Sequence, residues 1–435
     1  MQNNFFNKMN RVYFIGIGGI GISAIARMLI SQGKKVSGSD TAESEITSAL
    51  RKLGANITIG QSIEYIKDDI DLVIYSPAIK IFDPKLIEEI KNKNILAITY
   101  PEALHEISKT KYTIAVSGTH GKTTVTAMIA KVLIDAGLDP TVVVGSLIKD
   151  KNGESTNFIA GSSDYFVVEA CEYERSFLNI EPRIAVINNI DADHLDYYGD
   201  LNGVIVGFNE FAKKVSAHGF IVCDSHDEKV AKALVGVEGK IIDRKESYPK
   251  SIKLMVPGEH NRLNAATAIA VAKVLGVENN QALKSLESFS GAWRRFEYKG
   301  KTKDGTLIYD DYAHNPQKVA AALQGAREMF PDKRIVAVFQ PHLFSRTKLL
   351  LNEFACAFFD ADEIVLAPIF PAREVFDPTI SSVILAAKIK ENNKEAKAFV
   401  SFEDVENYLK SSLKSTDLLI TMGAGEQYKI GENLL

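Results

Sequence analysis

Short apolar runs alternate along almost the whole chain with longer stretches whose apolar residues recur every three or four positions. Such runs are typical of buried parallel strands, and such stretches are typical of amphipathic helices. The predicted strands are 12–15, 35–38, 72–75, 95–99, 112–116, 165–168, 184–187, 307–309, 335–339, 363–367 and 418–422, and the predicted helices include 20–31, 46–53, 84–91, 123–136 and 261–275. This alternation predicts an α/β fold with mainly parallel sheets.

A chain of 435 residues is too long for a single hydrophobic core, so the alternating pattern must be divided among domains. A polar stretch near residue 108 and a second break near residue 290 give three α/β domains in series. The predicted domains are 1–108, 109–291 and 292–435.

Composition and charge exclude several classes of protein. Hydrophobic residues make up 46% of the chain and charged residues 24%, as in ordinary globular proteins, and no apolar run approaches the roughly 18 residues that cross a membrane. The net charge of −4, with lysines interleaved among acids, gives no basic surface for nucleic acid. Three widely spaced cysteines indicate neither a disulfide framework nor a cysteine zinc site, and the polar first ten residues favour a cytoplasmic protein.

A glycine-rich loop between the predicted strand 112–116 and helix 123–136 carries the strongest chemical signal. It comprises Ser117, Gly118, Thr119, His120, Gly121, Lys122, Thr123 and Thr124. Turn glycines let backbone N–H groups surround a polyphosphate, Lys122 neutralises charge, and the Thr123 hydroxyl reaches Mg²⁺. Val116 stands where the general phosphate loop has a glycine, so an ordinary turn and helix cap is the alternative. The placement after a strand favours a nucleoside triphosphate site.

A second glycine motif, at 16–21, follows the first predicted strand. Gly16, Gly18 and Gly21 fit the dinucleotide-binding fingerprint, and Asp40 ends the next strand where a ribose-binding acid is expected. Tight packing without a ligand is the alternative. Because the motif recognises a pyrophosphate, it does not distinguish NAD from another diphosphate. A dehydrogenase needs no phosphate loop, whereas an ATP-driven enzyme acting on a nucleotide-diphosphate-linked substrate needs both motifs.

Acidic residues follow two further strands of the central domain. Glu169 ends the predicted strand at 165–168 and is placed to hold Mg²⁺ on the phosphates, while Glu172 and Glu174 are expected to face solvent. His194 lies among carboxylates after strand 184–187, where it is predicted to hold a second metal ion, and a structural histidine is the alternative.

The chain resembles the Mur ligases, and the resemblance covers nearly all of it. The motifs that carry it are GIGGIG at 16–21, SGTHGKTT at 117–124, EACEY at 169–173, DHLD at 193–196, GEHNRLN at 258–264, RRFE at 294–297, DDYAHNP at 310–316, and FQPH at 339–342 with SRT at 345–347. Phe208 occupies the place of a carboxylated lysine that relatives adding later amino acids carry, so the branch that adds L-alanine is favoured.

The resemblance implies a Rossmann-like first domain that binds the UDP part of the substrate, a P-loop ATPase-type central domain, and a Rossmann-like third domain that closes over ATP and the amino acid. It implies ATP and Mg²⁺ as cofactors, with UDP-N-acetylmuramate and L-alanine as substrates. ATP would phosphorylate the muramyl carboxylate, and the amine of L-alanine would attack the acyl phosphate. A monomer or homodimer without nucleic-acid or membrane partners is expected.

The resemblance also implies roles for single residues. Lys122 would contact the phosphates, Thr123 and Glu169 would hold one Mg²⁺, and His194 the second. The remaining nucleotide-binding set is Gly118, Thr119, His120, Gly121, Thr124, Asn261 at the adenine, Asp311 by the ribose and Arg295 at the phosphates. The UDP-substrate set is Gly16, Gly18, Gly19, Ile20, Gly21, Asp40, Ser76 and His314, and His342 and Arg346 would face the reacting groups.

Some alternatives stay open at this point. Arg294 and Arg295 also fit a solvated pair between domains, Asn261 also fits a helix cap, and His314 and His342 also fit buried structural positions. Leu343 and Pro77 depart from the family pattern near expected ligand sites. A ligase that reattaches a recycled tripeptide, an NAD-dependent dehydrogenase and a non-catalytic nucleotide-binding protein are the competing functions.

Overall fold

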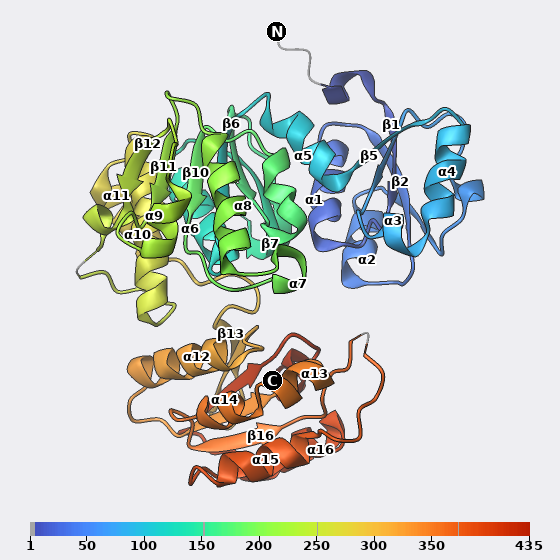
Figure 1. Cartoon of the computed structure of the whole chain (residues 1–435). Helices are drawn as coiled ribbons and strands as arrows, with labels where there is room; N and C mark the ends of the chain where they lie inside the picture. The colour runs from blue at the N-terminus through green and yellow to red at the C-terminus, as the bar shows by residue number, and fades with distance from the viewer. Residues whose placement is uncertain (1–4, 151–152, 250, 373) are drawn as a thin grey trace. The chain divides into compact units, whose positions relative to one another are not determined.

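The computed structural model describes residues 5–150, 153–249, 251–372 and 374–435. They form two compact units, Met1–Ile252 with Leu263–Glu287 and Lys253–Arg262 with Ser288–Leu435. The described residues build three sheets in which most neighbouring strands are parallel, with helices between the strands (Figure 1). The α/β architecture expected from the alternating pattern is thus confirmed.

The first sheet, in the first unit, is entirely parallel in the order β3-β2-β1-β4-β5. Its strands are β1 (Arg11–Ile15), β2 (Lys35–Asp40), β3 (Asn56–Ile59), β4 (Leu72–Tyr75) and β5 (Leu96–Thr99). Its helices are α1 (Ile20–Ser31), α2 (Glu45–Lys52), α3 (Ile79–Phe82), α4 (Pro84–Asn92) and α5 (Tyr100–Ser108), with the 3₁₀ turns η1 (Phe5–Lys8) and η2 (Ile63–Tyr65). The strand order reverses between β1 and β4, and parallel sheets bind ligands at such a point.

The second sheet, also in the first unit, has the order β12-β11-β10-β6-β9-β7-β8, and only its β7–β8 pair is antiparallel among the described strands. Its strands are β6 (Tyr112–Ser117), β7 (Thr141–Lys149), β8 (Ser155–Ile159), β9 (Tyr165–Glu169), β10 (Ile184–Ile187), β11 (Phe220–Cys223) and β12 (Lys240–Asp243). The accompanying helices are α6 (Lys122–Asp135), α7 (Leu195–Tyr198), α8 (Leu201–Lys213), α9 (Glu228–Ala233), α10 (Glu259–Val274) and α11 (Asn279–Glu287), with η3 (Tyr173–Asn179) and η4 (Arg244–Ser247).

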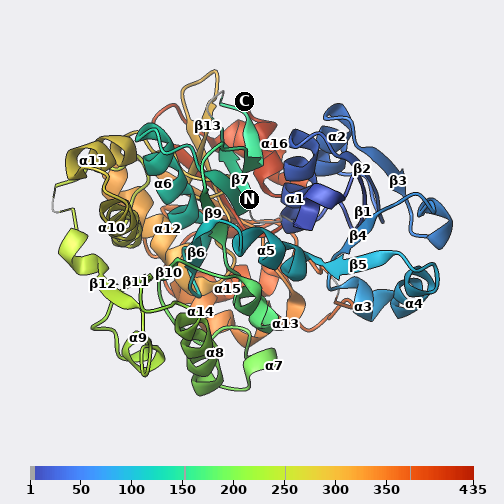
Figure 2. The ribbon, with the colours of Figure 1, turned by 90° about the horizontal axis from the view of Figure 1, so that it is seen from above.

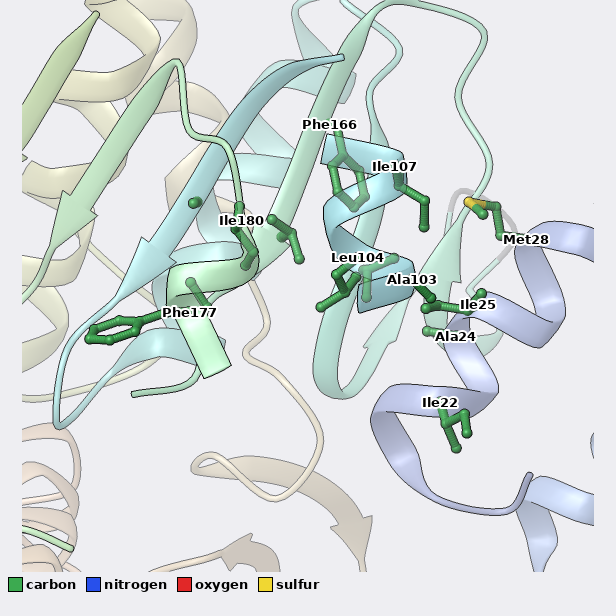
Figure 3. Packing of buried hydrophobic residues seen from close by; sticks show 14 of the residues in the cluster. Ile22, Ala24, Ile25, Met28, Ala103, Leu104, Ile107, Phe166, Phe177 and Ile180 are labelled. Atoms are coloured by element: carbon green, nitrogen blue, oxygen red, sulfur yellow. The ribbon is translucent and has the colours of Figure 1, made fainter. Parts of the chain in front are cut away.

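A shared hydrophobic cluster joins the first two sheets. Helices α1 and α5 lie between them in both ribbon views (Figures 1 and 2). Ile25 of α1, Leu104 of α5 and Phe166 of β9 belong to this one cluster, and each is almost fully buried (Figure 3). The Asn157 side chain on β8 adds a hydrogen bond of 2.8 Å from Nδ2 to the Ser23 hydroxyl of α1. The two glycine motifs are therefore held in one packed unit.

The third sheet, in the second unit, has the order β13-β14-β18-β15-β16-β17, with an antiparallel β13–β14 pair and parallel neighbours otherwise. Its strands are β13 (Glu297–Lys301), β14 (Leu307–Asp311), β15 (Ile335–Phe339), β16 (Glu363–Leu366), β17 (Ala396–Ala398) and β18 (Leu418–Met422). The helices are α12 (Pro316–Met329), α13 (Phe344–Leu349), α14 (Leu351–Cys356), α15 (Ser382–Lys390), α16 (Phe402–Ser412) and α17 (Tyr428–Glu432). Apolar clusters cover both faces of the sheet.

The predicted strands and helices are all present, with ends that differ by a few residues. Each of the three predicted domains contains one of the sheets, although their exact boundaries stay predictions. Within the described residues, no helix is long and apolar enough to cross a membrane. The three cysteines are unpaired, with Cys223 buried and the other two exposed.

Candidate active site

The phosphate loop connects β6 to α6 and needs glycine at two positions. Gly118 has a φ of +140° and Gly121, the N-cap residue of α6, a φ of +82°. A Cβ atom on Gly118 would lie 2.9 Å from Cβ of Asn188, and one on Gly121 would lie 2.5 Å from its Nδ2. Only glycine therefore fits this close approach to the chain after β10. The loop ends at the N-terminus of α6, where the first backbone amides of the helix favour a bound anion.

Two asparagines after β10 hold the backbone of the loop. Asn189 accepts a hydrogen bond from the His120 amide at 2.7 Å and donates to the His120 carbonyl at 3.0 Å. Asn188 donates to the same carbonyl at 2.9 Å, and the Thr119 hydroxyl accepts from the Asp191 amide at 2.8 Å. These contacts fix the shape of the loop before any nucleotide binds. The predicted contacts of Thr119 and His120 with a nucleotide stay predictions.

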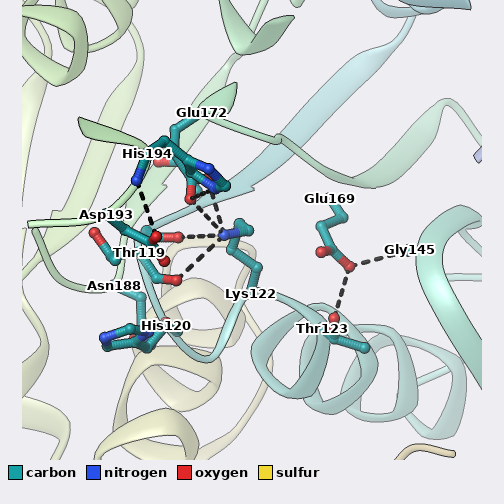
Figure 4. A network of polar contacts seen from close by, with 12 residues as sticks. Thr119, His120, Lys122, Thr123, Gly145, Glu169, Glu172, Asn188, Asp193 and His194 are labelled. Atoms are coloured by element: carbon teal, nitrogen blue, oxygen red, sulfur yellow. Dashed lines mark hydrogen bonds and ion pairs between the residues drawn. The ribbon is translucent and has the colours of Figure 1, made fainter. Parts of the chain in front are cut away.

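Lys122 is held by a carboxylate that sequence reasoning placed in solvent. Its Nζ donates to the Gly118 carbonyl at 2.7 Å and to Glu172 Oε1 at 2.9 Å, and Glu172 Oε2 lies 2.8 Å away (Figure 4). Glu172 is only 2% exposed, so the prediction that it faces solvent was wrong, whereas Glu174 is exposed as expected. Burial lowers the pKa of Lys122, but the charge of Glu172, together with Cys171, Glu169 and the hydrogen bond to Glu172, outweighs burial and leaves that pKa raised.

Glu172 is buried because the chain after β9 turns sharply back over the phosphate loop. The Tyr198 hydroxyl of α7 donates to the Glu172 backbone carbonyl, and both Glu174 and Arg175 adopt left-handed backbone conformations. This contact between distant segments has no local sequence signal. The only available clue was a carboxylate placed three residues after Glu169 in a loop that follows a buried strand.

Glu169 and Thr123 form the predicted magnesium pair on the other side of the loop. The Thr123 hydroxyl donates to Glu169 Oε2 at 3.0 Å, and the Gly145 amide donates to the same oxygen at 2.9 Å. A Cβ atom on Gly145 would lie 3.0 Å from this carboxylate. A hydroxyl and a carboxylate are the oxygen donors that Mg²⁺ prefers, so the pair fits that ion.

His194 lies beside Lys122 and Glu172, whereas Thr123, Glu169 and Gly145 form a separate group (Figure 4). Its Nε2 is 3.8 Å from Glu172 Oε1, and its ring centre is 4.8 Å from that of Tyr173. Within the described ranges, no group of three or more His, Cys, Asp or Glu side chains is arranged to hold a metal ion. A magnesium ion here would need phosphate oxygens or water among its ligands.

The first glycine motif forms a tight loop at the carboxyl end of β1. Gly16 has a φ of +76°, and Gly19 is the N-cap residue of α1, which begins at Ile20. The Gly18 amide donates to Asp40 Oδ2 at 2.7 Å, so Asp40 holds the loop itself. The Ser76 amide donates to the Ile15 carbonyl at 3.2 Å. The structure thus brings Gly16, Gly18, Asp40 and Ser76 to one edge of the sheet.

In the second unit, Arg294 has a structural place. It is 3% exposed, its Nε donates to Asp310 Oδ2 at 2.8 Å, and its other nitrogens donate to the Gly425 and Gly423 carbonyls at 2.7 Å each. The alternative of a solvated arginine pair is therefore wrong for Arg294. Arg295 is half-buried, and its guanidinium carbon lies 5.2 Å from the ring centre of Tyr312.

Three predicted residues of the second unit lie together. The His314 and His342 ring centres are 6.2 Å apart, and Arg346 Nη1 is 3.3 Å from His342 Nδ1. Burial, with the charges of Lys318 and Arg346, lowers the pKa of His314 to about 3 despite its bond to the Tyr312 carbonyl. Burial and Arg346 also lower the pKa of His342. Both imidazoles are therefore neutral at pH 7.

Two other residues that are predicted to bind the nucleotide already have hydrogen bonds within the second unit. Asp311 accepts hydrogen bonds from the Phe296 amide at 2.8 Å and the Ala313 amide at 2.7 Å. Asn261, in the first turn of α10, donates from Nδ2 to the Pro257 carbonyl at 2.7 Å. These bonds orient the two side chains, and their contacts with a nucleotide stay predictions.

Comparisons with known proteins decide the family. Three family patterns match in order: "Mur ligase family, catalytic domain" at residues 11–112, "Mur ligase middle domain" at 116–242 and "Mur ligase, glutamate ligase domain" at 294–425. A UDP-N-acetylmuramate–L-alanine ligase of Clostridium novyi is 42% identical over 462 aligned positions that cover 100% of this chain and 99% of the relative. The chain belongs to the Mur ligase family.

Solved structures agree with this assignment. The UDP-N-acetylmuramate-alanine ligase MurC of Thermotoga maritima is 29% identical to this Mur ligase, with a TM-score of 0.79 and 98% of each chain covered. A murein peptide ligase of Psychrobacter arcticus, 24% identical with a TM-score of 0.68 and 98% of each chain covered, shares the fold.

Proposed function

We propose that this Mur ligase joins L-alanine to UDP-N-acetylmuramate at the expense of ATP, through an acyl phosphate on the muramyl carboxylate. The observation that carries the proposal is the preformed phosphate loop, with Lys122 aimed by Glu172 and Thr123 paired with Glu169. It occurs in a chain 42% identical, over its whole length, to a ligase with this activity in its name.

The phosphate loop supports ATP binding through its backbone. The glycines at 118 and 121 let the loop pack closely against the chain after β10, and the amides at the start of α6 present partial positive charge. The pKa of Lys122 is raised by the acidic groups around it, Glu172 first among them, so Lys122 brings a full positive charge to the phosphates. Positioning and charge neutralisation are the main needs of phosphoryl transfer.

Thr123 and Glu169 would hold the magnesium ion. A bound Mg²⁺ would neutralise phosphate charge and polarise the phosphoryl group for attack. The Gly145 amide keeps the Glu169 carboxylate turned toward Thr123, which orients both oxygen donors in advance. His194, beside Glu172, is proposed to hold or orient a second metal ion.

In the proposed reaction, covalent bonds form and break only in ATP and the substrates, not in the protein. A carboxylate oxygen of the substrate attacks the γ-phosphorus, ADP leaves, and the alanine amine then attacks the acyl carbon and expels phosphate. We assign Lys122 and Arg346 to neutralise the charge on the transferred phosphoryl group. The neutral imidazoles of His314 and His342 are proposed to bind and orient substrate groups in the second unit.

The amino-acid substrate is tested by phosphate release from ATP with UDP-N-acetylmuramate and a panel of L-alanine, glycine, L-serine and the recycled tripeptide. We expect L-alanine to give the highest kcat/KM, and no release without the UDP substrate. Phe208, at the place of the lysine in later-acting relatives, is fully buried against Phe177. Release with the tripeptide but not with L-alanine would refute the proposal.

A further inference from the structure

Tyr100 is the first residue of α5, and its position is fixed by the start of that helix. Thr99 accepts a hydrogen bond from the Glu102 amide, the Glu102 carboxylate accepts from the Thr99 amide at 2.6 Å, and Pro101 follows Tyr100 in the first turn. Such a capping box defines where a helix begins. The tyrosine ring therefore leaves the backbone in a set direction.

The ring of Tyr100 reaches the first turn of α1. A Cβ atom on Gly21 would lie 2.8 Å from Cζ and 2.9 Å from the hydroxyl oxygen of Tyr100. The hydroxyl end of the ring thus occupies the space that any other residue at position 21 would need. This close approach explains the third glycine of the motif without a direct contact between that glycine and a ligand.

The same hydroxyl lies within the electrostatic reach of the magnesium pair. Burial raises the pKa of Tyr100, and the charge of Glu169 raises it further. The phenol therefore keeps its proton at neutral pH and offers a hydrogen-bond donor. It lies against the start of α1, where the glycine motif predicts a diphosphate, and close enough to Glu169, beside which the γ-phosphate is proposed to lie, to be affected by its charge.

No residue in the described part of the chain hydrogen-bonds to this hydroxyl. Tyrosine hydroxyl groups in largely buried places usually have a partner, because a buried donor without one is costly. The Tyr100 side chain is nevertheless only half-buried, so a ligand can reach it. A donor that is oriented by a capping box and lacks a protein acceptor is suited to a bound molecule.

We propose that the Tyr100 hydroxyl donates a hydrogen bond to an anionic oxygen of the UDP-linked substrate. The inference rests on the proposed function, because that substrate must extend from the first glycine motif to the phosphate loop. Its diphosphate and its carboxylate are the two possible acceptors on this path. Tyr100 is thus a substrate-binding residue that joins the two glycine motifs.

The test is Tyr100→Phe, which keeps the ring against Gly21 and removes only the hydroxyl. We expect the Kd of UDP-N-acetylmuramate, measured by calorimetry, to rise about tenfold, as for loss of one hydrogen bond to a charged group. The Kd of ATP and the Tm should stay within error of the native values, since the hydroxyl has no protein partner. Equal binding of UDP-N-acetylmuramate by the variant and the native protein would overturn the inference.

Two further measurements make the result specific. Binding of UDP alone to Tyr100→Phe locates the acceptor. If the variant loses affinity equally for UDP, the acceptor is on the diphosphate; if it loses affinity only for UDP-N-acetylmuramate, the acceptor is the carboxylate. Both results support the inference. Tyr112→Phe is the matched control, because Tyr112 is also half-buried and begins β6, at the other end of the strand from the phosphate loop. It should bind both ligands normally. Failure of the native protein to ligate L-alanine would refute the proposed function separately.

Discussion

The contact between Lys122 and Glu172 gives the sharpest prediction, through the substitution Glu172→Gln. The variant keeps the size of the side chain and one oxygen acceptor, but it removes the negative charge that faces Lys122. The carboxylate is 2% exposed, and its two oxygens lie 2.9 and 2.8 Å from Nζ, so little solvent screens the loss. Lys122 would then be buried without its nearest counter-charge.

The magnitude follows from the kind of bond that changes. The glutamine oxygen still accepts from the charged Lys122, but the attraction of the carboxylate charge is lost. A hydrogen bond to a charged group contributes about 1.5–3 kcal/mol, so losing part of it should cost about 1–2 kcal/mol of the free energy that positions Lys122. At about 1.4 kcal/mol for each factor of ten, kcat/KM for ATP should fall about 5- to 30-fold. The pKa of Lys122 should also fall, because burial lowers it once the charge of Glu172 is absent.

The assay is phosphate release at saturating UDP-N-acetylmuramate and L-alanine, with ATP varied, and with Tm measured on the same samples. Glu174→Gln is the matched control, because Glu174 is exposed and lies two residues further along the same turn. We expect the control to keep its kcat/KM for ATP within twofold. If Glu172→Gln also kept kcat/KM within twofold and the native Tm, Glu172 would not position Lys122.

Three further predictions address other parts of the site. Lys122→Ala should abolish L-alanine-dependent phosphate release while calorimetry shows normal UDP-N-acetylmuramate binding; near-normal turnover would refute its role. Thr123→Val should raise the Mg²⁺ concentration for half-maximal activity about tenfold. Thr126→Val is the control and should leave that concentration unchanged, because the Thr126 hydroxyl donates to the Lys122 carbonyl inside α6. Burial lowers the pKa of His314 to about 3 in the folded protein, against about 6.5 when unfolded, so the folded state is favoured by the neutral imidazole above pH 6.5. The folded protein loses this stability as the pH falls from 6.5 toward 3. This loss is up to about 1.4 kcal/mol per pH unit, so His314→Gln should lose less Tm than the native protein between pH 7 and pH 5; equal losses would contradict the assignment.

The sequence predicted many of the buried strands, but it missed β7, the longest strand in the described residues. Strand β10 and helix α1 have the predicted ends, because an uninterrupted apolar run and a helical period after glycines are strong local signals. The strands that were not predicted are β3, β7, β8, β11, β12, β13 and β17. Strands β3 and β17 are short and only partly buried, so their pairing depends on the neighbouring strand more than on their own sequence.

The site was predicted where a motif fixes its own geometry, and missed where distant segments meet. The loop glycines and the Thr123–Glu169 pair follow from a strand, a turn and a parallel neighbour. Glu172 was placed wrongly because its burial depends on a turn after β9 that is held by Tyr198, 26 residues further along the sequence. The sequence did not decide the role of Arg294, because its hydrogen-bond partners include the Gly425 carbonyl near the far end of the chain.

The central claim is that the phosphate loop activates the muramyl carboxylate by phosphorylation before L-alanine attacks. It is tested most directly with UDP-N-acetylmuramate labelled with ¹⁸O in both carboxylate oxygens, incubated with ATP, Mg²⁺ and L-alanine. We predict that the released phosphate carries one ¹⁸O atom by mass spectrometry and that the new amide keeps the other. Unlabelled phosphate, formed together with the alanyl product, would contradict the claim.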